Sequence, residues 1–258
     1  IQGAPAVVPS HSPMQPEMTA FIMPTSGTTG VSKLVPISNR MLVDVAAIKS
    51  ANMAMRETDT TIVFASLILI AGLSTYMLPL LYRGGCSVIA NFDIDNYINL
   101  LETYQPNWHN SSPALLHAIY EFLRVNPVPP VMKSLRYIRT GGAPFPPEMM
   151  RTLEDWLSIP IIPAYGMTEG LAGNICNLVP PGVRKHDSVG IPVHGEAAVF
   201  SEEGVQLPPH EVGELALRSP YIFKGYLNPE DNIPSPFIDG WFMTGDLARV
   251  DEDGYVTI

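Results

Sequence analysis

Residues 25–33, Thr-Ser-Gly-Thr-Thr-Gly-Val-Ser-Lys, gather groups that can hold an anion. Gly27 and Gly30 permit backbone conformations that turn several N–H groups toward one point. Lys33 adds a positive charge, and hydroxyl donors come from Thr25, Ser26, Thr28 and Thr29. The spacing differs from GxxxxGK[ST], the phosphate loop of ordinary nucleotide triphosphatases. Taken alone, the segment is equally consistent with a phosphate-binding loop and with a polar turn.

Three later segments also combine glycine with groups suited to ligand binding. They are Gly-Gly-Ala-Pro at 141–144, Tyr-Gly-Met-Thr-Glu at 165–169 and Thr-Gly-Asp at 244–246. Each has an ordinary interpretation: Glu169 as a surface carboxylate, Asp246 as a turn residue, Tyr165 as part of the core. It is their order along the chain that makes them informative.

In this order, the four segments resemble the signature motifs of the adenylate-forming (AMP-binding) superfamily. That superfamily contains acyl- and aryl-CoA ligases, firefly luciferase and the adenylation domains of peptide synthetases. The resemblance runs from about Thr19 to Ile258. It implies that a carboxylic acid reacts with ATP to give an acyl-AMP and pyrophosphate. A thioester then forms on coenzyme A or on a carrier-protein phosphopantetheine.

The resemblance also assigns roles to individual residues. Tyr165 and the backbone of 141–144 stack on adenine, Thr168 approaches the α-phosphate, and Asp246 holds the ribose. Glu169 holds Mg²⁺, and the catalytic groups are Lys33, Thr168 and Glu169. The expected ATP contacts are Thr25, Ser26, Gly27, Thr28, Thr29, Gly30, Lys33, Gly142, Ala143, Pro144, Tyr165, Gly166, Met167, Thr168 and Asp246.

The chemistry suits these residue types. A carboxylate that attacks the α-phosphate brings two anions together, so cations and N–H groups must screen their repulsion. A general base is unnecessary because a carboxylate is already ionised at neutral pH. We therefore expect no Ser/His/Asp arrangement.

The expected acid pocket departs from the family pattern. The resemblance places Leu69, Asn110, Gly141, Gly142 and Gly166 around it. Leu69 stands where many acyl- and aryl-CoA ligases have His in Pro-Leu-Phe-His-x-x-Gly. Leu69 and the glycines would leave the pocket apolar and open, which favours a fatty, aryl or other apolar acid. Residues 69–72 lack the Asp that holds the amine in amino-acid adenylation domains.

Apolar segments alternate with helical patterns from residue 19 to about 174. This alternation predicts an α/β fold with a mainly parallel sheet and helices on both faces. Ligands of such sheets bind beyond the carboxyl ends of the strands. We expect three strand-to-helix loops there, at 25–33, 140–144 and 165–169. For residues 175–258 we expect a smaller β-rich subdomain of distorted-barrel type. We interpret residues 1–18 as a loop or a cut end.

The composition limits the other functions. With a net charge of −10, the chain is a poor candidate for binding nucleic acid or an anionic membrane. Two cysteines without metal-ligand spacing predict buried free thiols. Residues 60–82 carry no charge, but Ser66, Gly72 and Pro79 interrupt them, so we expect a buried strand and helix rather than a membrane span. A cytoplasmic location is expected, or a peroxisomal one in a eukaryote.

In the family, a hinge and a small domain with a catalytic Lys would follow residue 258. We therefore interpret the chain as part of a longer enzyme, slow or inactive alone, whose partners are a small carboxylic acid and a carrier protein. Two alternatives stay open. One is a non-catalytic remnant that binds nucleotide or a partner protein, and the other is an adenylation domain of a multidomain peptide or polyketide synthetase.

Overall fold

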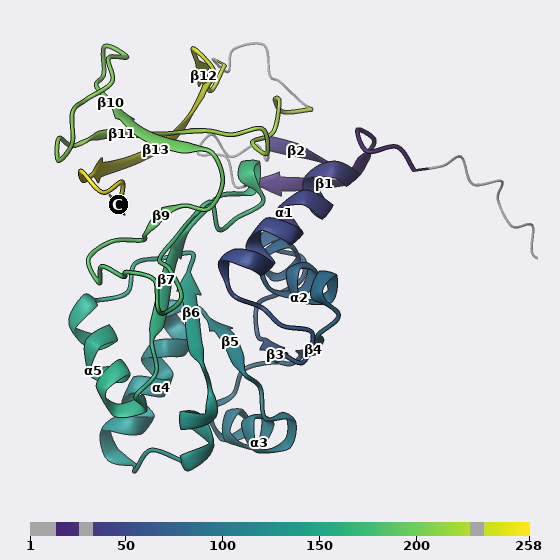
Figure 1. Ribbon diagram of the computed structural model, residues 1–258, viewed down its shortest axis with the longest axis vertical. Helices are drawn as coiled ribbons and strands as arrows, with labels where there is room; N and C mark the ends of the chain where they lie inside the picture. The colour runs from purple at the N-terminus through teal and green to yellow at the C-terminus, as the bar shows by residue number, and fades with distance from the viewer. Residues whose placement is uncertain (1–13, 26–32, 228–234) are drawn as a thin grey trace, which may run out of the picture.

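The computed structural model describes residues 14–25, 33–227 and 235–258. Its largest element is a seven-stranded sheet in the order β4-β3-β5-β6-β7-β8-β9 (Figure 1). The first five of these strands are parallel, whereas β8 and β9 are antiparallel additions at one edge. The strands are β3 (Thr60–Val63), β4 (Cys86–Ile89), β5 (Trp108–Ser111), β6 (Tyr137–Gly141), β7 (Ile161–Tyr165), β8 (Ile175–Cys176) and β9 (Ile191–Pro192). The predicted α/β fold is therefore confirmed.

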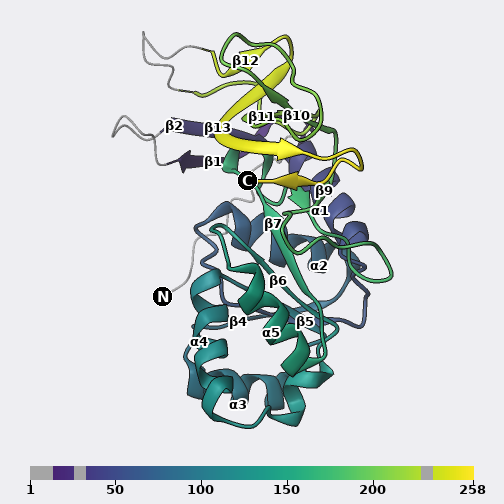
Figure 2. The ribbon, with the colours of Figure 1, turned by 90° about the vertical axis from the view of Figure 1, so that its left-hand side faces the viewer.

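Helices cover both faces of this sheet, as Figures 1 and 2 show from two sides. Alternate residues of each strand face opposite ways. Ile138 of β6 packs with the helices of one face, and Tyr137 packs against the other face. The first group is α3 (Ile94–Tyr104), α4 (Pro113–Val125) and α5 (Pro147–Leu157), with the short η2 (Pro130–Ser134) beside them. The second is α1 (Asn39–Asn52), η1 (Gly72–Met77) and α2 (Leu78–Arg83).

Side-chain caps fix where three of the helices begin. The Ser38 hydroxyl accepts from the Met41 N–H, and the Ser112 hydroxyl accepts from the Leu115 N–H. The Asp93 carboxylate accepts from two N–H groups in the first turn of α3. Each bond satisfies a backbone donor that has no partner within its helix.

A second, antiparallel sheet lies at the other end of the molecule. Its order is β10-β11-β13-β12, with β14 paired to β13. The strands are β10 (Glu196–Phe200), β11 (Gly213–Arg218), β12 (Phe237–Ile238), β13 (Trp241–Val250) and β14 (Val256–Thr257). Leu215, Leu217 and Phe242 share a core with Val35 and Val45. Strands β8 and β9 still belong to the large sheet, and the second sheet begins at β10.

One local prediction is wrong. Residues 25–33 do not join a strand to a helix: they join β1 (Thr19–Thr25) to β2 (Lys33–Ser38) in an antiparallel hairpin, where Thr25 pairs with Lys33. Pro36 conceals β2 in the sequence, because proline removes a backbone donor and is uncommon in strands. A two-stranded hairpin tolerates it, and Val35 and Ile37 bury the inner face.

No described helix is long and apolar enough to cross a membrane. The uncharged segment 60–82 instead forms β3, η1 and most of α2. The expectation of two buried thiols holds for Cys176 and fails for Cys86, which is exposed on β4 at the edge of the sheet.

Candidate active site

The predicted acid-pocket residues lie at one edge of the large sheet. Strands β5, β6 and β7 run parallel, so Asn110, Gly141 and Gly166 all fall near their carboxyl ends. A Cβ at Gly141 would lie 2.6 Å from the Ala164 carbonyl oxygen, and one at Gly166 would lie 2.0 Å from the backbone nitrogen of Gly173. Larger residues would force these backbones apart.

Gly142, Ala143 and Pro144 follow at the same edge and are exposed. Gly142 has a φ of +89°, in the left-handed region that favours glycine. Apart from Gly142 and its two chain neighbours, no described residue has a heavy atom within 4 Å of the position its Cβ would take. The described atoms thus leave room for a ligand above this backbone.

The turn after β7 holds Glu169 in a fixed position. Leu171, Ala172 and Gly173 all have left-handed backbones, with φ of 61°, 58° and 54°. Two consecutive non-glycine residues in this region are unusual and need local support. Asn174 supplies it: its Oδ1 accepts from the Met167 N–H at 3.1 Å, and its Nδ2 donates to the Gly170 carbonyl at 2.8 Å.

Tyr226 joins Glu169 to Lys33. Its hydroxyl donates to Glu169 Oε1 at 2.7 Å, and Lys33 Nζ lies 5.1 Å from the centre of its ring. Burial and this hydrogen bond raise the pKa of Tyr226. The Phe223 N–H donates to the Glu169 carbonyl at 2.7 Å, which fixes the backbone on the same side. Groups from the hairpin, from the turn after β7 and from the region before residue 228 therefore meet here.

Asp246 reaches the same edge from the second sheet. The Tyr165 hydroxyl donates to Asp246 Oδ2 at 2.5 Å, and burial and this bond raise the pKa of Tyr165. Thr244 orients the segment: its hydroxyl donates to the Leu215 carbonyl and accepts from the Asp246 N–H. Gly245, with a φ of +80°, donates its N–H to Glu214 Oε1.

The remaining predicted site residues are Leu69 and those of the loop after Thr25. Ser26, Gly27, Thr28, Thr29 and Gly30 lie outside the described residues. Leu69 is 63% exposed in the turn after β3, where its N–H donates to the Ser66 carbonyl. It follows a strand of the same parallel set and so lies on the same edge of the sheet.

Within residues 14–25, 33–227 and 235–258, no cluster of three or more His, Cys, Asp or Glu side chains could hold a metal ion. Mg²⁺ commonly takes one or two carboxylates and completes its shell with water and substrate phosphates. Glu169, with Thr168 beside it, suits that mode of binding.

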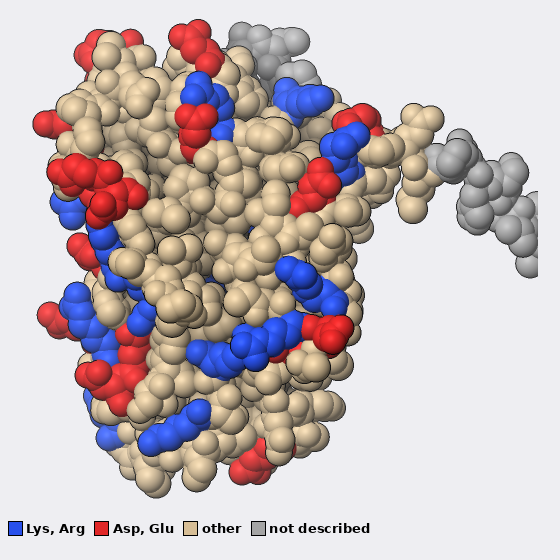
Figure 3. Space-filling view, viewed as in Figure 1, with Lys and Arg blue, Asp and Glu red and all other residues tan. Residues whose placement is uncertain are grey.

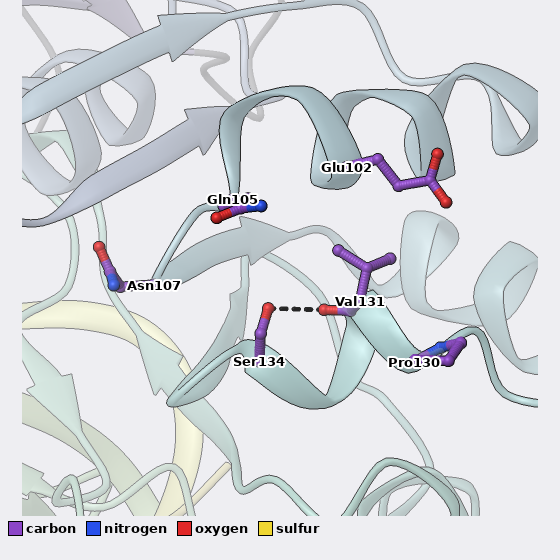
Figure 4. A pocket seen from close by; sticks show the side chains of 6 residues that line it. All are labelled: Glu102, Gln105, Asn107, Pro130, Val131 and Ser134. Atoms are coloured by element: carbon purple, nitrogen blue, oxygen red, sulfur yellow. Dashed lines mark hydrogen bonds between the residues drawn. The ribbon is translucent and has the colours of Figure 1, made fainter.

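A hollow of about 700 Å³ lies elsewhere, between α3 and η2 (Figure 4). Asn107 immediately precedes β5, so the hollow is at the amino ends of the parallel strands, opposite the candidate site. Its wall includes Ser134, whose hydroxyl donates to the Val131 carbonyl. On the face seen in Figure 3, Lys and Arg side chains are interspersed with Asp and Glu.

A model of the AMP-binding enzyme family matches residues 2–227. The chain belongs to this family. It is 31% identical to the oxalate–CoA ligase of Arabidopsis thaliana, over 93% of this chain and 48% of that protein. It is 32% identical to the sulfoacetate–CoA ligase of Cupriavidus necator, over 95% of this chain and 48% of that protein.

The fold agrees with these relationships. The O-succinylbenzoate coenzyme A synthetase of Bacillus subtilis, solved with ATP and a magnesium ion, superposes with a TM-score of 0.83 at 27% identity. The match covers 95% of this AMP-binding chain and 50% of that one. The chain thus spans about half the length of the relatives it matches.

Sequence reasoning missed several residues that shape the site. Nothing in the spacing around Tyr226 indicates its contact with Glu169, because the two residues meet only in the fold. Asn174 was equally unmarked. Arg139 did carry a signal, since a charged residue inside an apolar strand is rarely buried without a reason. Lys49 on α1 is likewise a charged residue that is buried.

Proposed function

We propose that this chain is the nucleotide-binding part of a longer enzyme that activates a carboxylic acid as its acyl-AMP and transfers the acyl group to coenzyme A. One observation carries the proposal: the contacts Lys33–Tyr226, Tyr226–Glu169 and Tyr165–Asp246 gather these residues around the carboxyl end of β7. The similarity to acid–CoA ligases supports it.

The chemistry assigned to these residues is a displacement at phosphorus. A substrate carboxylate oxygen bonds to the α-phosphorus of ATP, and the bond to the β-phosphate bridging oxygen breaks, so that pyrophosphate leaves. Lys33 balances the charge of the leaving group, and Thr168 donates to the α-phosphate. Mg²⁺ held by Glu169 would supply further positive charge to the phosphates. Repulsion between the reacting anions is reduced without a general base.

The remaining contacts position the nucleotide. Asp246 accepts hydrogen bonds from the ribose hydroxyls, and the Tyr165 ring and the open backbone at 142–144 enclose the adenine. The Tyr165–Asp246 bond fixes both groups before the ligand arrives, so less ordering is required on binding. This preorganisation is what a nucleotide site needs.

The thiol acceptor is assigned by similarity. The oxalate and sulfoacetate relatives are CoA ligases, which favours coenzyme A over a carrier-protein phosphopantetheine. The names of these two relatives refer to small acids with two anionic groups, whereas another relative at 32% identity is named for 2-succinylbenzoate. The apolar acid expected from Leu69 and the glycines is a weaker proposal than a charged one.

Acid-dependent exchange of labelled pyrophosphate into ATP tests the proposal in the complete gene product. We expect exchange with at least one acid of a panel and none when the acid is omitted. A protein that binds ATP in calorimetry but gives no exchange with any acid would instead be a non-catalytic nucleotide-binding remnant.

A further inference from the structure

Lys49 and Arg139 are buried cations, each 1% exposed. Among the residues described, no carboxylate forms an ion pair with either of them. The neighbouring thiol of Cys176 does not serve as a counter-charge, because burial raises its pKa. Burying an unpaired charge is strongly unfavourable, and two neighbouring cations also repel each other. Because both buried cations are unfavourable for stability, a function that requires them would explain their presence.

Neutral oxygens surround Lys49. Its Nζ donates to the Leu171 carbonyl at 2.6 Å, to the Thr75 hydroxyl at 3.2 Å and to the Ser74 carbonyl at 3.3 Å. Burial and the repulsion from Arg139 lower the pKa of Lys49. These contacts fix the ammonium group in place but leave its charge without a counter-ion.

The hydrogen-bond donors of Arg139 are less fully paired than those of Lys49. Its Nη1 contacts the Met53 sulfur at 3.1 Å, a weak acceptor, and its guanidinium lies 5.9 Å from the centre of the Tyr76 ring. Its buried Nε has no hydrogen-bond partner among the described atoms. A guanidinium presents a planar set of donors that matches a carboxylate or a sulfonate. Here part of that set is unused.

Arg139 packs against Gly173, and Thr75 connects this point to Lys49. A Cβ at Gly173 would lie 2.6 Å from Arg139 Nη2 and 3.5 Å from Cγ2 of Thr75, the residue that Lys49 contacts. Gly173 in turn backs directly onto Gly166 of the expected acid pocket. Arg139 is also the register partner of Asn110, another residue expected in that pocket. The cations therefore lie immediately behind the place assigned to the acid.

We propose that Lys49 and Arg139 bind a second anionic group of the substrate, so that the enzyme activates small dicarboxylic or sulfo-carboxylic acids rather than apolar ones. This inference rests on the proposed function. It agrees with the names of the oxalate–CoA and sulfoacetate–CoA ligases, whose acids both carry a second anionic group. A monoanion would leave both cations unpaired, which gives the site a physical basis for rejecting it.

The test compares acids of equal carbon number in the complete gene product. Dicarboxylates of two to about six carbons, and sulfoacetate, are measured against the matching monocarboxylates by pyrophosphate exchange. We expect kcat/KM to favour a dianion by about 100-fold or more, since a site with buried polar groups strongly rejects an analogue that cannot pair with them. This comparison in the wild type does not depend on any variant folding.

Lys49→Met then tests the assignment of residues. It keeps an unbranched side chain that is one atom shorter and removes the charge. We expect it to lower kcat/KM for the preferred dianion at least tenfold, with the KM for ATP unchanged and the monoanion unaffected or improved. Lys133→Met, the same change at an exposed lysine on η2, is the matched control and should match the wild type.

The outcomes separate the two proposals. Exchange that favours monocarboxylates overturns this inference and leaves the proposed function standing. Equal losses for both acid classes in Lys49→Met also overturn it, because they indicate a purely structural lysine. If no acid supports exchange, thermal melting of this chain decides: a dianion that raises the melting temperature of the wild type but not of Lys49→Met supports the site, and no shift refutes it.

Discussion

The Tyr165 hydroxyl donates a 2.5 Å hydrogen bond to Asp246, although the two residues are 81 positions apart. The bond joins the end of β7 in the large sheet to β13 in the second sheet. The two residues expected on the adenine and the ribose are therefore already in contact before a nucleotide binds. The relative position of the two sheets thus bears directly on the geometry of the proposed ATP site.

Replacing Asp246 with Asn should weaken ATP binding. The amide keeps the shape of the side chain but loses the negative charge that accepts strongly from ribose hydroxyls and from Tyr165. A hydrogen bond to a charged group contributes about 1.5–3 kcal/mol, so we expect the KM for ATP to rise by about tenfold or more. Pyrophosphate exchange at varied ATP measures this.

Asp239→Asn is the matched control. Asp239 is exposed beside β12 and has a left-handed backbone, which Asn also tolerates, so exchange should be unchanged. An equal rise in KM in both variants would mean that the effect on ATP does not come from the Tyr165–Asp246 contact.

Lys33→Ala should slow exchange by about tenfold or more. Lys33 begins β2 and its Nζ lies over the Tyr226 ring, close to Glu169. Its removal takes away a charge-assisted contact with the pyrophosphate, worth on the order of 1–3 kcal/mol. Lys224→Ala, at an exposed position two residues before Tyr226, serves as a control. Unchanged exchange in Lys33→Ala would remove the hairpin from the proposed site.

Tyr226→Phe should raise the Mg²⁺ concentration needed for half-maximal exchange. The ring under Lys33 remains, but Glu169 loses the donor that orients its carboxylate. Groups that orient a metal ligand typically change metal affinity by about 10–100-fold, and we expect about tenfold here. A magnesium titration of exchange measures it, with Tyr104→Phe at an exposed tyrosine of α3 as the control. A change in rate at all Mg²⁺ concentrations alike would contradict the positioning role.

Local signals predicted the large sheet and its helices because those signals lie within single segments. Ser38, Asp93 and Ser112 each precede a helix and cap it through the side chain, and the helices after Asp93 and Ser112 are amphipathic. The hairpin was missed because Pro36 weakens the strand pattern of β2. Whether a strand forms there depends on burial of Val35 against the second sheet, which a short segment does not reveal.

The site shows the same division. Order along the chain singled out Lys33, Tyr165, Glu169 and Asp246. The structure links Tyr165 directly to Asp246, and it links Lys33 to Glu169 through Tyr226. Tyr226 lies 57 positions after Glu169 and contacts it only in the folded chain, so no local sequence pattern indicates the contact. Arg139 is a charged residue within an apolar strand, which is a signal in the sequence, whereas nothing in the pattern of α1 indicates that Lys49 is buried.

We expect the protein to lose stability in mild acid because His109 is buried. It is fully buried on β5; its Nδ1 donates to the Asn110 carbonyl, and its Nε2 accepts from the Tyr97 hydroxyl at 2.8 Å. Burial lowers its pKa from 6.5 to about 4. Below about pH 6.5 this histidine is protonated in the unfolded chain, whereas in the native state it stays neutral until about pH 4. The free energy of unfolding therefore falls as the pH drops from about 6.5 to about 4.

Removing this group should flatten the pH dependence. Between about pH 7 and about pH 5, the shift of one such histidine corresponds to about 2 kcal/mol of lost stability. His109→Gln retains an acceptor for Tyr97 and should reduce the loss by that amount in denaturant unfolding. His194, whose pKa burial also lowers to about 4, should account for a further part. His117→Gln, at an exposed position on α4, should leave the pH dependence unchanged. An unaltered slope in His109→Gln would show that His109 is not neutral in the native protein.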